Sequence, residues 1–185
     1  VVSVWSADGH LLGCGHYQVG SISVRMLSFG SEYLPESYWV DSIRGAYELR
    51  KAFGLTDNLQ TNCYRLVHGE GVYLPGLIID YYDGVCVLQA HSVGMFRSKK
   101  QICLALKDVY SDKLKAVYDK SSGTAPFKAG LELVDGYIYK KEGFSEEESV
   151  VKENGNNFWV NWGEGQKTGF FLDQRENRAL VGKYA

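Results

Sequence analysis

The chain has 185 residues, of which 45% are hydrophobic and 23% charged, and its formal net charge is −2. This composition is typical of a globular protein, and the net charge argues against a general nucleic-acid binder. No stretch approaches the ~20 consecutive apolar residues of a membrane-spanning helix, and no secretory signal pattern follows Val1.

The four cysteines indicate reduced thiols. Cys14, Cys63, Cys86 and Cys103 show no paired spacing, and each lies in an apolar or strand-like stretch. We therefore expect buried free thiols in a cytoplasmic protein that does not associate with membranes. Cys14 and His16 alternate on one strand, but no second ligand pair follows, so no metal site is expected.

The first 30 residues predict three short antiparallel strands. Asp8-Gly9 is a hairpin signal between two alternating runs, and a third run, "SISVRMLSF", ends near Gly30. Three strands leave unpaired edges, so we expect either an incomplete sheet or the last strands of a barrel that begins before Val1.

The middle of the chain predicts an α+β order. A helical pattern runs from Pro35 to the stop at Gly54. Strands are expected in "CYRLV", "GLIIDYY" and "VCVLQAH", then one helix from about Phe96 to Tyr110, then strands in "LKAVYDKSS" and "GLELVDGYIYKKEG". This order predicts a sheet covered on one face.

The last third begins with an acidic connector, "EGFSEEESV". A hairpin follows, with its turn at Asn154-Gly155, because both residue types accept a positive φ. A final helix is expected from about Asp173 to Tyr184, with Glu176 completing a capping box.

Positive charge gathers in one segment. From Arg97 to Lys128 there are eight basic and three acidic residues, a net charge of +5 within an otherwise acidic chain. The segment is either a solvated helix face or an RNA-facing patch, and charge alone does not separate the two. The RNA hypothesis assigns the contacts to five residues: Arg97, Lys99, Lys100, Lys107 and Lys113.

Other short patterns favour structural roles. The glycine pairs that begin at Gly13, Gly69 and Gly163 do not fit a phosphate-binding loop and are typical of turns. No serine, histidine and acid lie at the spacing of a catalytic triad. His68 beside Glu70 is typical of a hydrogen-bonded turn, although an acid–base pair is an alternative.

The stretch "GQKTGFFLDQRENR", residues 165–178, is the most distinctive in the chain. Gly169 permits a tight turn with exposed polar groups, and the apolar residues after it anchor the turn in a core. The helix that follows presents free backbone N–H groups. Such a turn either holds a polar ligand against an aromatic wall or is a closely packed corner between a hairpin and a helix.

Three motifs together resemble a known family. "TNCYRLVHGEG…LPGLIID", "VKENG..FWV" and "GQKTGFFLDQRENR", in this order, resemble the S-adenosylmethionine-dependent methyltransferases that make 5-methylcytosine in large-subunit ribosomal RNA. The resemblance covers essentially the whole chain. One departure occurs at Val72 and Tyr73, where the family tends to have Asp-Gly.

The resemblance implies three parts and an incomplete enzyme. It implies the trailing strands of an RNA-binding PUA barrel (1–33), a central strand-strand-helix-strand-strand domain (34–149), and the hairpin and first helix of a Rossmann-like catalytic domain (150–185). The family's glycine-rich cofactor loop and nucleophilic cysteine would then lie after Ala185. We therefore expect no catalytic residue in this chain and an inactive fragment of a longer enzyme.

By the same resemblance, the distinctive turn contributes to the S-adenosylmethionine pocket. The residues it assigns to that pocket are Gln166, Lys167, Thr168, Gly169, Phe170, Phe171 and Gln174. Ribosomal RNA is the implied partner, and a homodimer is an open option. Two alternatives stand beside this hypothesis: a non-catalytic RNA-binding module, and a methyltransferase with a different substrate.

Overall fold

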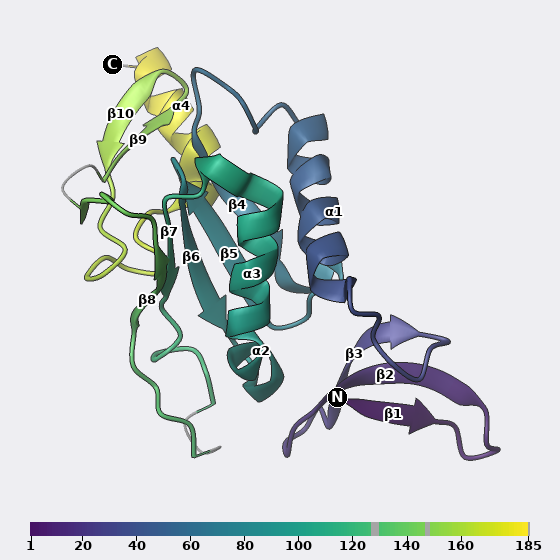
Figure 1. The fold of residues 1–185 in the computed structure, drawn as a ribbon. Helices are drawn as coiled ribbons and strands as arrows, with labels where there is room; N and C mark the ends of the chain where they lie inside the picture. Colours follow the sequence, from purple (N-terminus) through teal and green to yellow (C-terminus); the bar gives the residue numbers. More distant parts are fainter. Residues whose placement is uncertain (127–129, 147–148, 185) are drawn as a thin grey trace.

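A five-stranded mixed sheet forms the centre of the computed structural model, which describes residues 1–126, 130–146 and 149–184. Its spatial order is β4-β5-β6-β7-β8 (Figure 1). The strands are β4 (Cys63–His68), β5 (Leu77–Tyr82), β6 (Val85–Ala90), β7 (Ala116–Asp119) and β8 (Gly136–Lys140). Neighbouring pairs are antiparallel except β6 and β7, which are parallel.

The parallel pair is joined by helices, as a crossover of this kind requires. Helix α2 (Val93–Arg97) and helix α3 (Lys99–Tyr110) replace the single helix expected from the sequence. Ser92 caps α2, because its Oγ accepts a hydrogen bond from the Met95 N–H (3.2 Å). Helix α2 begins at Val93, earlier than expected. The chain bends at Ser98, which is 9% exposed, and this bend separates α2 from α3.

One face of the sheet packs against α1 (Tyr38–Ala52) and α3 (Figure 1). Ile43 and Ala46 of α1 and Ile102 and Leu106 of α3 are buried in this layer. The opposite face of the sheet is also covered, by Val151, Val160, Trp162 and Leu172 of the last third of the chain. The expectation that only one face is covered was therefore incomplete, because a segment distant in sequence packs on the second face.

The last third forms the predicted hairpin, with β9 (Val150–Glu153) and β10 (Asn156–Trp159). The φ angles at Asn154 (50°) and Gly155 (82°) confirm a turn of the kind the sequence predicted. Helix α4 (Arg175–Tyr184) follows a 3₁₀ turn at Leu172–Gln174. Glu147 and Glu148 of the acidic connector and Lys128 of the basic segment lie outside the described residues.

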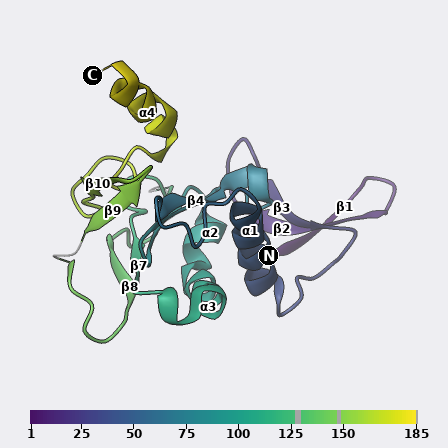
Figure 2. The same ribbon diagram turned by 90° about the horizontal axis from the view of Figure 1, so that it is seen from above.

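The first strands, β1 (Val2–Trp5), β2 (Leu11–Tyr17) and β3 (Val24–Phe29), form a separate three-stranded antiparallel sheet. Within the described ranges this sheet does not close into a barrel, as expected for three short strands. It lies at the opposite end of the molecule from the β9–β10 hairpin (Figures 1 and 2). The division at residues 33 and 149 stays a prediction.

His16 joins the first sheet to the central part. A Cβ atom at Gly94 of α2 would lie 2.1 Å from the imidazole Cγ, so only glycine fits against this ring. The ring also stacks on Trp39 of α1, with centroids 6.3 Å apart. His16 is 7% exposed, and its Nδ1 has no hydrogen-bond partner among the described residues. Burial, helped by the positive N-terminus, lowers the pKa of His16 to about 4.

This pKa gives the junction a defined pH dependence. Below about pH 6.5 the unfolded chain protonates this histidine, whereas folded His16 stays neutral until about pH 4, so the free energy of unfolding falls as pH is lowered. We expect His16→Gln to remove roughly 1–2 kcal/mol of the stability difference between about pH 7.5 and about pH 5. Urea unfolding at both pH values measures this, with exposed His10→Gln as the control. Equal acid sensitivity in wild type and His16→Gln would contradict the depressed pKa.

Candidate functional site

The distinctive stretch forms a tight loop between β10 and α4. The Gly165 N–H donates to the Asn161 carbonyl (2.9 Å), and the Gly169 N–H donates to the Gln166 carbonyl (2.8 Å). Gly169 has a φ of 117°, and a Cβ atom there would lie 2.8 Å from both the Asn161 carbonyl oxygen and the Trp162 Cα. Glycine is therefore required at 169 because the backbone there packs directly against the backbone of Asn161 and Trp162.

Thr168 points into the protein. It has no exposed surface, and its Oγ1 lies 2.6 Å from Asp80 Oδ2 and 2.7 Å from the Tyr82 hydroxyl. An ionised Asp80 can only accept, so Thr168 donates to it and Tyr82 donates to Thr168. The expectation of an exposed polar group at Thr168 was wrong, because its hydroxyl is already used within the core.

Asp80 is the centre of this network. The carboxylate has no exposed surface and lies in the apolar strand β5. Arg65 of β4 donates to it twice, from Nε (2.8 Å) and from Nη2 (3.0 Å). These bonds raise the pKa of Arg65, and burial raises the pKa of Tyr82. The loop is therefore joined to the central sheet by one continuous path, Tyr82–Thr168–Asp80–Arg65.

A second buried acid holds the start of α4. Glu153 of β9 is 2% exposed and accepts two bonds from Arg178, at 2.7 and 2.8 Å, and one from Arg175 at 3.3 Å. Arg175 also donates to the Cys63 carbonyl at 2.6 Å. Both arginines of the distinctive stretch thus connect α4 to the hairpin, and Arg175 also connects it to β4.

The exposed face of the loop consists of other residues. The Lys167 Nζ lies 3.2 Å from each Asp173 carboxylate oxygen and 4.6 Å from the Phe171 ring centroid. Hydrogen bonds from Gln174 and Lys167 lower the pKa of Asp173. Gln166 and Gln174 are exposed beside this group. These side chains offer a cation, amides and one aromatic face to solvent.

A cavity of about 450 Å³ adjoins this loop. Its walls include Arg50 of α1, Arg65 and His68 of β4, and Leu172 and Arg175. The Arg50 Nε donates to the Arg65 carbonyl (2.6 Å), and among the described residues no carboxylate lies within ion-pair distance of Arg50. Asp173 and Glu176 line the cavity as well, so Arg50 adds a cation without an ion-pair partner to a cavity of mixed charge.

Of the seven residues assigned to the cofactor, four are exposed: Gln166, Lys167, Phe171 and Gln174. Phe170 is half-buried, with its ring 5.2 Å from that of Phe158 and 4.2 Å from the Arg178 guanidinium. Sequence reasoning missed Asp80. The signal was present, because an acid inside the apolar run "GLIIDYY" needs a buried partner.

The five residues assigned to RNA divide into two groups. Lys99 pairs with buried Asp119 at 2.6 Å, and Lys113 pairs with Asp57. Arg97, Lys100 and Lys107 are exposed, and within the described ranges none has a carboxylate at ion-pair distance.

Two of the unpaired residues, Lys100 and Lys107, are seven residues apart on one face of α3, with exposed Leu104 between them. Arg97 is the last residue of α2, just before the bend at Ser98. Lys107 also lies 4.4 Å from the Tyr139 ring centroid. We refer to Arg97, Lys100 and Lys107 as the basic stripe.

The four cysteines follow the sequence-based expectation. All four cysteines are free and buried. Within residues 1–126, 130–146 and 149–184, no three histidine, cysteine or acidic side chains gather as a metal site. In the same ranges no helix combines the length and apolarity that crossing a membrane requires.

The chain is similar to ribosomal RNA methyltransferases over its whole length. No family model matches the chain. It is 37% identical over its whole length to ribosomal RNA large subunit methyltransferase I of Alteromonas mediterranea, of which it covers 45%. It is 34% identical over its whole length to a protein of Methanocaldococcus jannaschii provisionally named a ribosomal RNA large subunit methyltransferase, of which it covers 44%.

A solved structure agrees with the fold. A protein provisionally classified as a methyltransferase, crystallised with S-adenosylhomocysteine (SAH), superposes with a TM-score of 0.76 at 25% identity, over 96% of this chain and 43% of that one. The mixed sheet is thus shared with a methyltransferase-type structure. The chain spans less than half the length of these relatives.

The Thr168 network predicts a stability effect. Thr168→Val keeps the shape but leaves Asp80 and the Tyr82 hydroxyl short of a partner, so the free energy of unfolding should fall by about 1–3 kcal/mol. Thr168→Ser keeps the hydroxyl and should retain most of the stability. Urea unfolding of both variants measures the difference. If Thr168→Val and Thr168→Ser lower the free energy of unfolding equally, the packing of the methyl group matters and the hydroxyl hydrogen bonds do not.

Proposed function

We propose that this chain is part of an S-adenosylmethionine-dependent methyltransferase that modifies large-subunit ribosomal RNA. The observation that carries the proposal is the similarity to a ribosomal RNA large subunit methyltransferase along the whole chain, at 37% identity. The chain covers 45% of that relative's length, so we propose the activity for a protein as long as the relative and not for these 185 residues alone.

The exposed face of the loop fits one wall of a cofactor site. S-Adenosylmethionine carries a flat adenine, ribose hydroxyls and a charged amino-acid group, and supplies an electrophilic methyl on its sulfonium. The Phe171 ring offers an apolar face, and the Gln166 and Gln174 amides can donate and accept hydrogen bonds. Thr168 and Gly169 support this wall, because Thr168 bonds to Asp80 of the sheet and Gly169 packs against Asn161 and Trp162 within the loop.

The proposed product is 5-methylcytosine. That chemistry needs a cysteine thiolate to add to C6 of the base, which makes C5 nucleophilic. Burial raises the pKa of each cysteine in this chain, to about 12 in the case of Cys63, so all four stay protonated thiols. The nucleophile is therefore assigned to a residue outside this chain, and the chain alone is expected to be inactive.

The proposal includes the division of the chain. Residues 1–33 are assigned to an RNA-binding PUA-like barrel, 34–149 to a central domain and 150–185 to the entry of the catalytic domain. The open three-stranded sheet at 2–29 supports the first assignment, since other strands would complete it. A cytoplasmic location and a homodimer belong to the proposal as well.

A non-catalytic RNA-binding module is the second candidate. The observation in its favour is the basic stripe, whose three cations have no carboxylate partner among the described residues. A methyltransferase acting on another substrate is the third candidate. Product analysis separates all three.

Methyl transfer tests the main proposal. The complete reading frame that contains this chain should transfer labelled methyl from S-adenosylmethionine to unmodified large-subunit ribosomal RNA, with 5-methylcytosine as the product nucleoside. Phe171→Ala should weaken cofactor binding by roughly 1 kcal/mol, the scale of one aromatic contact. Calorimetric titration measures this binding.

Phe53→Ala, at an exposed residue that ends α1, is the matched control, and it should bind the cofactor as the wild type does. Cofactor binding without methylation of RNA would favour another substrate. Failure of the complete protein to bind the cofactor at all would leave only the RNA-binding module.

The basic stripe makes a separate prediction about salt. If Lys100 contacts a phosphate, Lys100→Glu should weaken RNA binding and reduce the slope of log affinity against log salt by about 1. Lys99→Glu is a poor probe, because it would leave Asp119 buried beside a second negative charge. Fluorescence anisotropy with ribosomal RNA fragments at several salt concentrations measures both quantities. Exposed Lys183→Glu on α4 is the control, and an unchanged slope in Lys100→Glu would mean that the stripe is only solvated.

A further inference from the structure

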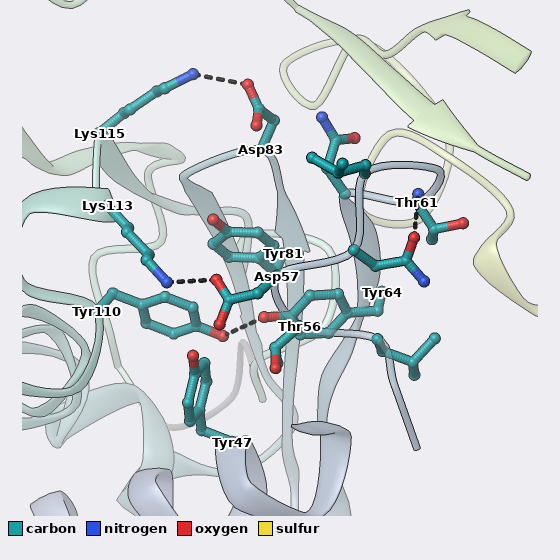
Figure 3. Close-up of a pocket in the computed structure, with 14 residues that line it drawn as sticks. Tyr47, Thr56, Asp57, Thr61, Tyr64, Tyr81, Asp83, Tyr110, Lys113 and Lys115 are labelled. Carbon is teal, nitrogen blue, oxygen red and sulfur yellow. Dashed lines mark hydrogen bonds and ion pairs between the residues drawn. The ribbon is translucent and has the colours of Figure 1, made fainter. Parts of the chain in front are cut away.

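A second cavity, of about 520 Å³, lies between α1, the loop 55–62, the sheet and the end of α3 (Figure 3). Four tyrosines from four different elements line it: Tyr47 of α1, Tyr64 of β4, Tyr81 of β5 and Tyr110 of α3. We call this cavity the tyrosine pocket. Its volume lies within the range of about 300–1,000 Å³ that is typical of small-ligand sites.

The tyrosines form a rigid aromatic surface. Tyr81 stacks on Tyr64 with centroids 4.9 Å apart and on Tyr110 at 4.8 Å, with planes 26° and 11° from parallel. The edge of Tyr47 meets Tyr110 at 5.3 Å. The Tyr64 and Tyr110 hydroxyls share a hydrogen bond of 3.0 Å. Burial raises the pKa of Tyr64, Tyr81 and Tyr110, so these phenols remain neutral. Tyr64 and Tyr110 are each 3% exposed, so the partly exposed rings of Tyr47 and Tyr81 are the surface that suits a flat, uncharged ring.

One polar group without a partner also lines the pocket. The Thr56 Oγ1 is buried, lines the pocket and has no hydrogen-bond partner among the described residues. A buried hydroxyl without a partner is unfavourable, and a ligand that bonds to it would remove this cost. A base edge, which carries donors and acceptors, could supply that bond.

Two ion pairs frame the mouth of the pocket. Lys113 pairs with Asp57, and Lys115 lies 2.7 Å from Asp83 (Figure 3). All four side chains are 43–59% exposed. Exposed pairs of this kind contribute about 0–1 kcal/mol, so either lysine can exchange its carboxylate for a phosphate at low cost.

The tyrosine pocket adjoins the cavity of mixed charge described above. Leu55 and Tyr64 line both cavities. An aromatic subsite therefore lies beside Arg50, which has no carboxylate partner in the described part of the chain. This juxtaposition matches a nucleotide strand, in which each flat base is flanked by phosphates, better than an isolated aromatic molecule.

We propose that the tyrosine pocket binds one unpaired base of a single-stranded RNA segment, with neighbouring phosphates contacting Arg50 and Lys113. This inference rests on RNA as the partner in the proposed function and adds where and how a strand is held. Duplex RNA does not fit, because its bases are already stacked on one another and cannot reach an aromatic pocket. The contact is to ring faces, so it tolerates different bases.

Anisotropy with a labelled single-stranded RNA 12-mer and its duplex tests the pocket, using the 185-residue chain. Tyr47→Leu removes a flat ring but keeps an apolar side chain, and it should weaken single-strand binding about 5- to 100-fold. Tyr47→Phe retains the ring and should bind nearly as the wild type does. Thr56→Val should lose affinity about 2- to 10-fold, because the unpaired hydroxyl is gone.

Tyr184→Leu, at an 89% exposed tyrosine of α4, is the matched control and should change nothing. Circular dichroism checks that each variant is folded. If Tyr47→Leu does not fold, Thr56→Val still tests the pocket. The proposal is wrong if Tyr47→Leu and Thr56→Val both keep the wild-type affinity, or if duplex and single strand bind equally well. If uridine and adenosine monophosphates bind as tightly as the 12-mer, the pocket is a site for a free nucleotide instead. Methyl transfer is measured separately, so each of these results leaves the proposed function standing.

Discussion

Asp80 is a charged group in a place where a charge is costly, and the position of the loop 161–171 depends on how that cost is offset. Taking a carboxylate out of water costs several kcal/mol unless donors replace its hydration. Arg65 supplies two donors from the neighbouring strand, and Thr168 supplies one from a residue 88 positions later in the chain. Moving the loop would leave the acid short of one bond, so the loop has one favourable position on the sheet.

This arrangement divides the distinctive stretch into two sets of residues with different tasks. Thr168, Gly169, Arg175 and Arg178 are occupied with internal contacts to the sheet and hairpin. The side chains left for another molecule lie on the outer face, where Lys167 and Phe171 contact each other. A single motif can thus act as both framework and binding surface, and the two roles alternate along the chain.

Local patterns in the sequence predicted those elements that local forces determine. The turn at Asn154-Gly155 follows from two residues that tolerate positive φ, and α1 follows from the spacing of its apolar residues. The parallel pairing of β6 with β7 and the burial of Thr168 depend on partners far along the chain, which no local window contains. Likewise, Lys99 and Lys100 are adjacent in sequence, yet about 100° of helical rotation separates them, so one meets Asp119 and the other solvent.

The cover on the second face of the sheet has a consequence for synthesis on the ribosome. The strands of that face, with Cys63, Tyr82 and Val87, are made long before Trp162 and Leu172, which cover them. Until those residues leave the exit tunnel, one side of a finished sheet is bare and apolar. Chains grow at about 5–20 residues per second, so this interval lasts seconds, long enough for aggregation or capture by a chaperone.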